Sequence, residues 1–346
     1  MPTDERKIPE IMTAVVLQSY DGADALAIEE RPVPRPGPDE VLIKVAASPI
    51  NPSDLAFLEG NYGTEKTPPV VAGLEGSGTV VAVGSGLMGR YLMGKRVACI
   101  AGGDGVWADY LLTTSNLAYP LSSSVDLQEG SMSLVNPITA LALLSIAKEG
   151  GHRAFVQTAA ASALGQMIVH VAAGEHITVI NIVRRDDQAA LLREQGAQVI
   201  LNSEEAGFDE RLAQVCHEYD AHLALDAVAG PLSLRVLQAM PRNSRLIVYG
   251  GLSLEAVQID PGDLIFQNKR VEGFWLTNWM GKKNFFQSLT LWRRAQRLMG
   301  TTLRTNIRAR YPLEKAKTAV EAYQDQMTGG KILLVPGMNE LQGIDL

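Results

Sequence analysis

The fold of this chain is decided by residues 154–185, which read AFVQTAAASALGQMIVHVAAGEHITVINIVRR. Residues 154–158 are apolar enough for a buried parallel strand, and residues 163–173 repeat small and apolar side chains at helical spacing. A second apolar run, residues 177–183, follows the helix. The stretch therefore predicts a strand, a small-residue turn, a helix and a second strand, which form the βαβ unit of a doubly wound parallel sheet.

The turn between the first strand and the helix is built from small side chains. Ala160, Ser162 and Gly165 occupy the three glycine positions of the GxGxxG register found in dinucleotide-binding proteins. Small side chains let a pyrophosphate reach the helix N-terminus, where unpaired N–H groups favour an anion. The residues of the turn that we expect to bind the cofactor are Ala161, Ser162, Ala163, Leu164 and Gly165.

The second strand of this unit ends at a pair of arginines, Arg184 and Arg185. An NAD site usually places Asp or Glu about 20 residues after the turn, where the carboxylate binds the ribose 2′-hydroxyl. A guanidinium group instead suits a 2′-phosphate, which a carboxylate would repel. The pair predicts NADPH as the cofactor, and the alternative is an ordinary βαβ unit with two solvated arginines.

Composition argues against several other classes of protein. The length of 346 residues suggests about two domains, and 31 basic against 38 acidic residues leave no positive excess for nucleic acid. The two cysteines, Cys99 and Cys216, form no CxxC pair, so a reducing, cytoplasmic environment fits best. No apolar run approaches the roughly 20 residues of a spanning helix. We expect a small-molecule substrate and neither a nucleic-acid nor a membrane partner.

The spacing of turn residues divides the chain into three segments. Short β-rich stretches cut by Pro and Gly predict a barrel-like domain at residues 1–128. Helices alternating with six short apolar strands predict the doubly wound parallel sheet at residues 129–272. Residues 273–346 are expected to return to the β-rich domain. The fold class is therefore α/β, with the parallel sheet inserted in a β-rich domain, and the sixth strand is expected at residues 271–276.

Two further motifs lie in the β-rich domain, NPSD at residues 51–54 and GLE at residues 73–75. Together with the domain order they resemble the medium-chain dehydrogenase/reductase superfamily over residues 12–336, which implies a Rossmann domain inserted in a GroES-like catalytic domain. Zinc-dependent members carry a Cys near the first motif, a His in the middle of the second and four clustered structural cysteines. None of these is present, so the resemblance implies a zinc-free oxidoreductase without a metal.

Other segments resemble the trans-2-enoyl-thioester reductases of the mitochondrial type. They are GNYG at 60–63, NP at 136–137, YGG at 249–251 and GFWL at 273–276 with Trp279. The resemblance implies that Tyr62 is the proton donor. It also implies an NADPH site lined by Asn136, Ser162, Arg184, Arg185, Tyr249, Gly250, Gly251, Phe274, Trp275 and Lys331.

The chemistry expected of Tyr62 is general acid catalysis. Hydride addition to the β-carbon of an enone or enoyl thioester pushes negative charge onto the carbonyl oxygen and the α-carbon, so an acid must deliver a proton. A tyrosine, with an ordinary pKa of about 10, is protonated at neutral pH and can donate. Quinone reduction and a non-catalytic NADPH-binding sensor are the alternatives. A homodimer is expected, because the family often pairs its nucleotide domains edge to edge.

Several of these residues also have ordinary structural interpretations. Tyr62 could be a turn tyrosine packed on its loop, and Phe274 with Trp275 could be part of a buried strand. Lys331 could be a solvated lysine at a strand start, and Asn136 could cap the helix that follows it. We interpret Glu75, in the GLE motif, as a structural residue.

Overall fold

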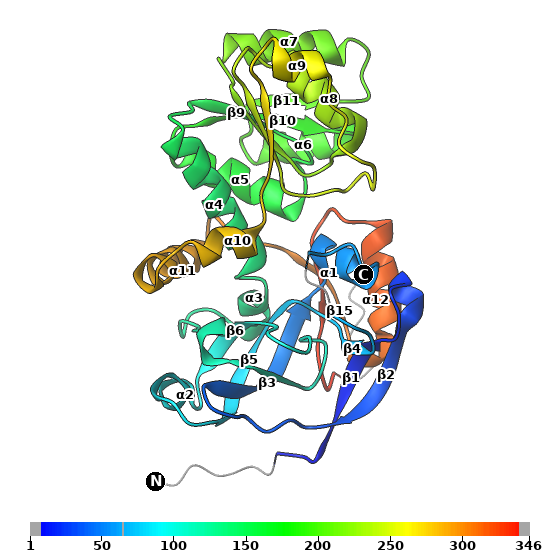
Figure 1. Cartoon of the computed structure of the whole chain (residues 1–346), viewed down its shortest axis with the longest axis vertical. Helices are drawn as coiled ribbons and strands as arrows, with labels where there is room; N and C mark the ends of the chain where they lie inside the picture. The colour runs from blue at the N-terminus through cyan, green and yellow to red at the C-terminus, as the bar shows by residue number, and fades with distance from the viewer. Residues whose placement is uncertain (1–7, 64–65, 339–346) are drawn as a thin grey trace. The chain divides into compact units, whose positions relative to one another are not determined.

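The computed structural model describes residues 8–63 and 66–338, and the chain divides into two compact units (Figure 1). The α/β unit is Asn136–Arg304, and the β-rich unit comprises the residues up to Val135 together with those from Thr305 onward. These boundaries differ from the expected ones, because residues 273–304 belong to the α/β unit. Two contacts hold that segment there: Arg294 bonds Glu175 at 2.7 Å, and His170 Nδ1 lies 3.2 Å from the carbonyl oxygen of Thr302.

The α/β unit contains a six-stranded sheet in the order β11-β10-β9-β12-β13-β14, and every neighbouring pair is parallel. This arrangement confirms the doubly wound parallel sheet. Its strands are β9 (Ala154–Gln157), β10 (Thr178–Val183), β11 (Val199–Asn202), β12 (Leu223–Asp226), β13 (Arg245–Val248) and β14 (Arg270–Gly273).

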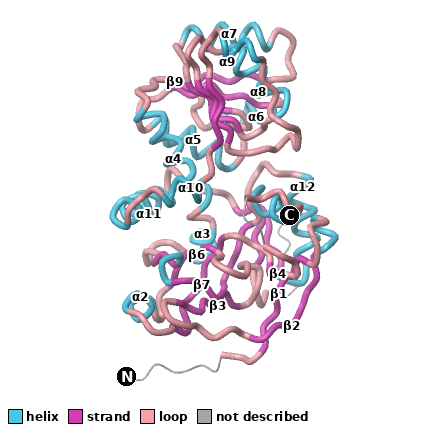
Figure 2. Tube along the Cα trace, viewed as in Figure 1, coloured by secondary structure: helices cyan, strands magenta, loops and turns pink. Residues whose placement is uncertain are grey.

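Helices connect and follow these strands, and Figure 2 shows them in cyan beside the magenta strands. Apolar side chains of the strands pack with those of the helices into a core that includes Val156, Ile180, Leu212 and Val236. The helices are α4 (Val135–Glu149), α5 (Ala163–Ala173), α6 (Asp186–Glu194), α7 (Phe208–Glu218), α8 (Gly230–Ala239), α9 (Pro261–Ile265), α10 (Leu276–Gly281) and α11 (Phe285–Met299).

The β-rich unit has two sheets, one in the order β2-β1-β4 and one in the order β15-β16-β3-β5-β6-β8, with β7 also paired to β3. Its strands are β1 (Ile11–Leu17), β2 (Leu26–Pro32), β3 (Glu40–Pro49), β4 (Val70–Val71), β5 (Glu75–Val83), β6 (Arg96–Ile100), β7 (Tyr110–Thr114), β8 (Ala118–Pro120), β15 (Ile307–Tyr311) and β16 (Lys331–Leu334). Its helices are α1 (Pro52–Leu58), α2 (Leu87–Leu92), α3 (Leu127–Ser131) and α12 (Ala316–Asp325), with 3₁₀ turns η1 (Gly22–Ala25), η2 (Ser115–Leu117) and η3 (Leu313–Lys315).

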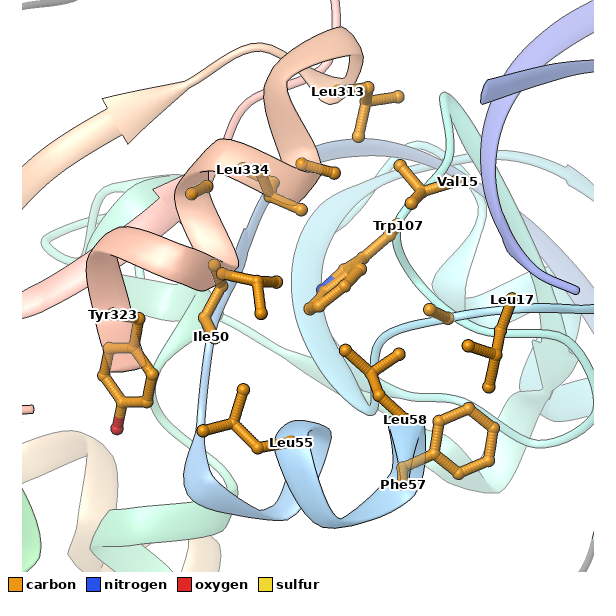
Figure 3. Close-up of a cluster of buried hydrophobic side chains, with 14 of the residues drawn as sticks. Val15, Leu17, Ile50, Leu55, Phe57, Leu58, Trp107, Leu313, Tyr323 and Leu334 are labelled. Carbon is orange, nitrogen blue, oxygen red and sulfur yellow. The ribbon is translucent and has the colours of Figure 1, made fainter. Parts of the chain in front are cut away.

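The main core of the β-rich unit is built from both ends of the chain (Figure 3). Trp107 is fully buried in it, beside Val15 of β1 and Leu58 of α1, and Leu313 and Leu334 reach the same core from the C-terminal segment. The expected return of the chain to the β-rich domain is therefore made by β15, α12 and β16.

The strand expected at residues 271–276 is shorter in the structure. Strand β14 ends at Gly273, and Leu276 begins helix α10. The N–H of Phe274 still donates to Val248 O at 2.8 Å, but the N–H of Trp279 donates to Trp275 O at 3.0 Å, which is a helical bond. The apolar run in the sequence continues across a point where the backbone changes from strand to helix, so its length overstated the strand.

Candidate active site

The loop after β9 carries the first group of expected cofactor residues. Ser162 is the N-cap of α5, and its hydroxyl accepts a hydrogen bond from the N–H of Gly165 at 3.0 Å. A Cβ at Gly165 would lie 2.4 Å from the carbonyl oxygen of Ala160 and 2.7 Å from that of Ala159. Only glycine therefore fits the third position of this loop, Gly165. The loop is also strained at its start, because Ala159 has φ of 48°, in the left-handed region that residues with a side chain seldom adopt.

The same loop is joined to the neighbouring strand β10. The N–H of Ala160 donates to Ile182 O at 3.2 Å, and Ala161 is buried against Val183. Ala163 and Leu164 are half-buried in the first turn of α5. The first-turn N–H groups of a helix have no intrahelical acceptor and favour an anion, so the loop can hold a pyrophosphate.

A buried amide pair that sequence reasoning missed supports the loop from below. Gln157 Nε2 donates to Gly165 O at 3.1 Å and to Asn181 Oδ1 at 2.7 Å, and the Asn181 amide donates to Val179 O and Val199 O at 2.9 and 3.0 Å. The pair links α5 to three adjacent strands. The signal was visible as one amide side chain in each of two apolar strands, since a buried amide must find partners.

The two arginines follow β10 directly, and both are exposed. The N–H of Arg184 donates to Gln188 Oε1 at 3.1 Å. Arg185 is the N-cap residue of α6 and pairs with Asp187, with Nε 3.0 Å from Oδ1 and a terminal nitrogen 3.4 Å from Oδ2. The Arg185 hydrogen bond is the main cause that lowers the pKa of the Asp187 carboxyl.

A second buried polar group, Asp226, lies at the end of β12. Its Oδ1 accepts hydrogen bonds from the Thr158 hydroxyl at 2.7 Å and from the N–H groups of Val228 and Ala229 at 2.9 and 3.2 Å. Its Oδ2 accepts one from the Ser233 hydroxyl at 2.5 Å. Because Thr158 follows β9, this carboxylate fixes the loop after β12 to the phosphate loop.

Tyr249 and Gly250 follow the next strand, β13. The N–H of Tyr249 donates to Asp226 O at 2.8 Å, and a Cβ at Gly250 would lie 2.8 Å from Ala227 O. The Tyr249 hydroxyl is buried and has no hydrogen-bond partner among the described residues. Burial is the main cause that raises the pKa of this hydroxyl, with the Asp226 charge second, so it stays neutral. A polar group in this position fits a site that a cofactor completes; the neighbouring Gly251 is exposed.

Phe274 and Trp275 follow β14 and are half-buried, so neither is the fully buried strand residue of the alternative interpretation. The rings of Phe274 and Trp279 lie 6.4 Å apart.

Asn136 is 9 % exposed in the first turn of α4, which begins at Val135, and therefore does not cap that helix.

The geometry of the sheet brings most of these segments to one edge. All six strands of the sheet are parallel, so their carboxyl ends share one edge. The expected cofactor segments follow five of them, β9, β10, β12, β13 and β14. The segments that leave this edge are 158–165, 184–185, 227–230, 249–251 and 274–275. In doubly wound sheets this edge, where the strand order reverses, is where ligands bind.

Tyr62 and Lys331 belong to the β-rich unit. Tyr62 is half-buried after α1 and packs against the core cluster shown in Figure 3. The turn before it needs a glycine, because Gly60 has φ of 73° and a Cβ there would lie 3.0 Å from the Tyr20 ring. Lys331 is only 2 % exposed, which contradicts its interpretation as a solvated lysine.

The Lys331 ammonium group lies in a buried polar cluster. It donates to Asn51 Oδ1 and, at 3.4 Å, to Ile50 O. Burial lowers the pKa of Lys331 to about 8, against the attraction of Glu75 and Asp54. Burial also raises the pKa of Asp54 to about 7, although its carboxylate accepts hydrogen bonds from the N–H groups of Asn51 and Leu74.

Glu75 completes this cluster. Its carboxylate accepts hydrogen bonds from Asn51 Nδ2 at 2.9 Å and from the N–H groups of Leu134 and Val135 at 3.3 and 2.9 Å. Burial is the main cause that raises its pKa. The three hydrogen-bond donors to Glu75 all belong to the β-rich unit, so the carboxylate links β5 to Asn51, the N-cap residue of α1, and to Leu134 and Val135.

Within residues 8–63 and 66–338, no group of three or more His, Cys, Asp or Glu side chains could hold a metal ion. Over the same residues, the helices are too short or too polar to cross a bilayer. Cys99 and Cys216 are both buried free thiols, and burial raises the pKa of each.

The α/β unit also contains an open cavity of about 430 Å³. The C-terminal end of α4 forms one side of it through Ser145 and Glu149, and Trp279, Phe286 and Leu291 supply apolar surface. The ammonium group of Lys283, which also lines the cavity, lies 4.2 Å from the centre of the Trp279 ring. The contact between Trp279 and Phe274 connects the cavity to the residues that follow β14.

A parallel sheet with a small-residue phosphate loop, inserted in a β-rich unit that the C-terminal strands complete, defines a two-domain dehydrogenase/reductase. Comparison with known proteins agrees. Residues 37–123 match the alcohol dehydrogenase GroES-like domain and residues 163–294 match the zinc-binding dehydrogenase family. The mitochondrial enoyl-[acyl-carrier-protein] reductase of Bos taurus is 31% identical over 264 residues, covering 75% of this chain and 70% of that protein. The human enzyme of the same name is 32% identical, covering 69% of this chain and 65% of that protein.

Among solved structures, a protein from Mesorhizobium loti described as an NADPH:quinone reductase has a TM-score of 0.89 and is 38% identical, over 95% of this chain and 100% of that one. The chain belongs to the medium-chain dehydrogenase/reductase superfamily and is an oxidoreductase.

Proposed function

We propose that this chain is a zinc-independent, NADPH-dependent reductase of an activated C=C bond, such as that of a 2-enoyl thioester or an enone. The observation that carries the proposal is the shared sheet edge, where the phosphate loop, the arginine pair and the segments after β13 and β14 meet in a member of this superfamily. The enoyl reductases among the relatives support the substrate class.

NADPH, when bound at this edge, would supply the hydride for the reaction. The first turn of α5 and the loop capped by Ser162 would hold the pyrophosphate. Arg184 and Arg185 are placed to bind the 2′-phosphate, because they directly follow the strand beside the phosphate loop. Tyr249, whose buried hydroxyl has no partner among the described residues, would bond the bound nucleotide. Asn136, Phe274, Trp275 and Lys331 complete the set of proposed cofactor residues.

Tyr62 is the proposed general acid. When the β-carbon of the substrate gains a hydride, the C=C π electrons move toward the α-carbon and the carbonyl oxygen. Tyr62 then gives its hydroxyl proton to the α-carbon, and the resulting phenolate regains a proton from water. The half-buried position of the ring on a rigid core would keep the hydroxyl in a fixed place.

The cavity beside Trp279 is a candidate surface for the apolar part of the substrate. Its aromatic and aliphatic walls suit an acyl chain, whereas a quinone or a small enone needs less surface. Quinone reduction is the second candidate function, favoured by the 38% identity to the Mesorhizobium loti protein.

One variant separates the two functions. Carbon protonation needs the acid, whereas a reduced quinone carries its charge on oxygen and can take its proton from water. We expect Tyr62→Phe to reduce turnover of a 2-enoyl thioester by about 10²- to 10⁴-fold while NADPH binding is retained. Tyr91→Phe is the control, because this tyrosine of the same unit is 58% exposed and stacks under Lys95.

The assay is NADPH oxidation with one enoyl thioester, one quinone, one simple enone and one aldehyde. Unchanged enoyl turnover in Tyr62→Phe would remove the acid role. Activity toward the quinone alone, equal in the wild type and in Tyr62→Phe, would establish the second function in place of the first.

A further inference from the structure

The pairing of Arg185 with Asp187 bears on how strongly the site selects its cofactor. Arg185 Nε and Nη2 donate to the two carboxylate oxygens of Asp187, at 3.0 and 3.4 Å. Asp187 therefore occupies one edge of the guanidinium group, an edge that could otherwise bind another anion. Asp187 lies in the first turn of α6, two residues beyond Arg185, and its side chain is 70% exposed. The pair is therefore at the surface, where an incoming anion can reach it.

A 2′-phosphate and Asp187 would share the donors of one guanidinium group. If the phosphate binds the Nε edge, Arg185 must release the carboxylate; if it binds the remaining N–H groups, Asp187 keeps part of the guanidinium charge and lies beside the phosphate. A ribose 2′-hydroxyl is neutral and does not require this exchange. The pair therefore weakens the binding of NADPH and leaves that of NADH nearly unaffected.

The neighbouring acid, Asp186, is engaged elsewhere. Its Oδ1 accepts a hydrogen bond from Asn202 Nδ2 at 3.0 Å. Gln188, the next residue after Asp187, uses its side-chain oxygen to accept the N–H of Arg184 at 3.1 Å. Of the two acids in the first turn of α6, Asp187 is thus the one that holds the guanidinium group.

We propose that Asp187 is a specificity-determining residue, which competes with the cofactor 2′-phosphate for Arg185 and so limits the preference for NADPH over NADH. The proposal rests on the proposed function in one respect, the use of NADPH. It assigns to this chain a selectivity below that which its two arginines alone would provide.

The test is the dissociation constant of each cofactor, measured by titrating protein fluorescence in low salt. We expect Asp187→Asn to lower the Kd of NADPH by about two- to fivefold, the ratio that an exposed ion pair is worth, and to change the Kd of NADH by less. In high salt the gain should shrink, because the charges are screened.

Asp209→Asn is the matched control. Asp209 also lies in the first turn of a helix of the same unit, α7, and pairs with an arginine, Arg235, at 2.7 Å. The control therefore makes the same change in net charge and at a helix N-terminus. In Arg185→Ala, the further change Asp187→Asn should change the ratio of the two Kd values less than it does in the wild type, because no guanidinium group is left to release.

Equal changes in the two Kd values, or the same gain in Asp209→Asn, would overturn the proposal. If the wild type binds no NADPH at all, the proposed function fails instead, so the two failures are distinguishable.

Discussion

Replacing Lys331 by Met should destabilise the β-rich unit strongly, and more at neutral than at acidic pH. The substitution keeps an unbranched side chain of similar length but removes the ammonium group, which attracts the Asp54 and Glu75 carboxylates electrostatically and donates to Asn51. Breaking a buried charge pair by removing one partner costs about 3–5 kcal/mol, because the other charge is left uncompensated. We expect a loss of that size at pH 7.5.

The pH dependence follows from the carboxyl groups. The pKa of Asp54 is about 7 in the folded protein and 3.8 ordinarily. Between these two values, the folded state therefore keeps a proton on Asp54 that the unfolded state has released. A raised pKa contributes stability that is fully present below the unfolded value and is lost as pH rises through the folded value. Without Lys331, the pKa values of Asp54 and Glu75 rise further. The destabilisation should therefore shrink by about 1–3 kcal/mol between pH 7.5 and 5.5.

Amide hydrogen exchange is the suitable assay, because a chain of two units need not unfold in one step. Peptides from β3, β5 and β16 report the opening free energy around Lys331. The control is Lys269→Met, which removes another buried lysine, 2.9 Å from Asp263 in the α/β unit, and should leave β-rich exchange unchanged. Exchange in Lys331→Met that matches the wild type, or a greater loss at pH 5.5, would refute the reasoning. Weaker NADPH binding with normal exchange would instead support the cofactor role of Lys331.

Two further predictions concern the α/β unit. Gly165→Ala should raise the Kd of NADPH at least about tenfold, because its Cβ would approach two backbone carbonyl oxygens to 2.4 and 2.7 Å. Gly174→Ala, at the other end of α5 and with 3.6 Å to its nearest neighbour, is the control, and equal Kd values in the two variants would contradict the steric argument. The chain should also sediment as a homodimer at micromolar concentration, since β14 ends the sheet and can pair with a second copy; a monomer throughout would exclude this.

The parallel sheet could be predicted because its strands are nearly uninterrupted apolar runs. Strand β10, Thr178–Val183, lies within the apolar run of residues 177–183 that predicts it. Strand β15 reads IRARY and is not among the expected strands; its apolar and charged residues alternate as in a half-buried strand, but over only five residues. Those arginines find partners only in the folded chain: Arg308 donates to Ala322 O and Arg310 to Gln128 Oε1, at 2.9 and 2.7 Å.

The candidate site divides in the same way. Gly165 could be predicted, because a local turn requires it whatever the rest of the chain does. The hydrogen-bond partners of Asp226 and Lys331 could not, since they lie far away in sequence: Asp226 accepts from Thr158, and Lys331 donates to Asn51. A polar residue inside an apolar run signals that such partners exist, but only the fold identifies them.

The β-rich core has a consequence for how the protein is made on the ribosome. Leu313 and Leu334 belong to the same core as Val15 and Trp107, so this core is incomplete until residues 313–334 have been synthesised. The α/β unit is a single uninterrupted stretch, Asn136–Arg304, and can fold as soon as it emerges. We therefore expect the part of the β-rich unit that precedes Asn136 to remain incomplete while the α/β unit, which is synthesised later, becomes native first.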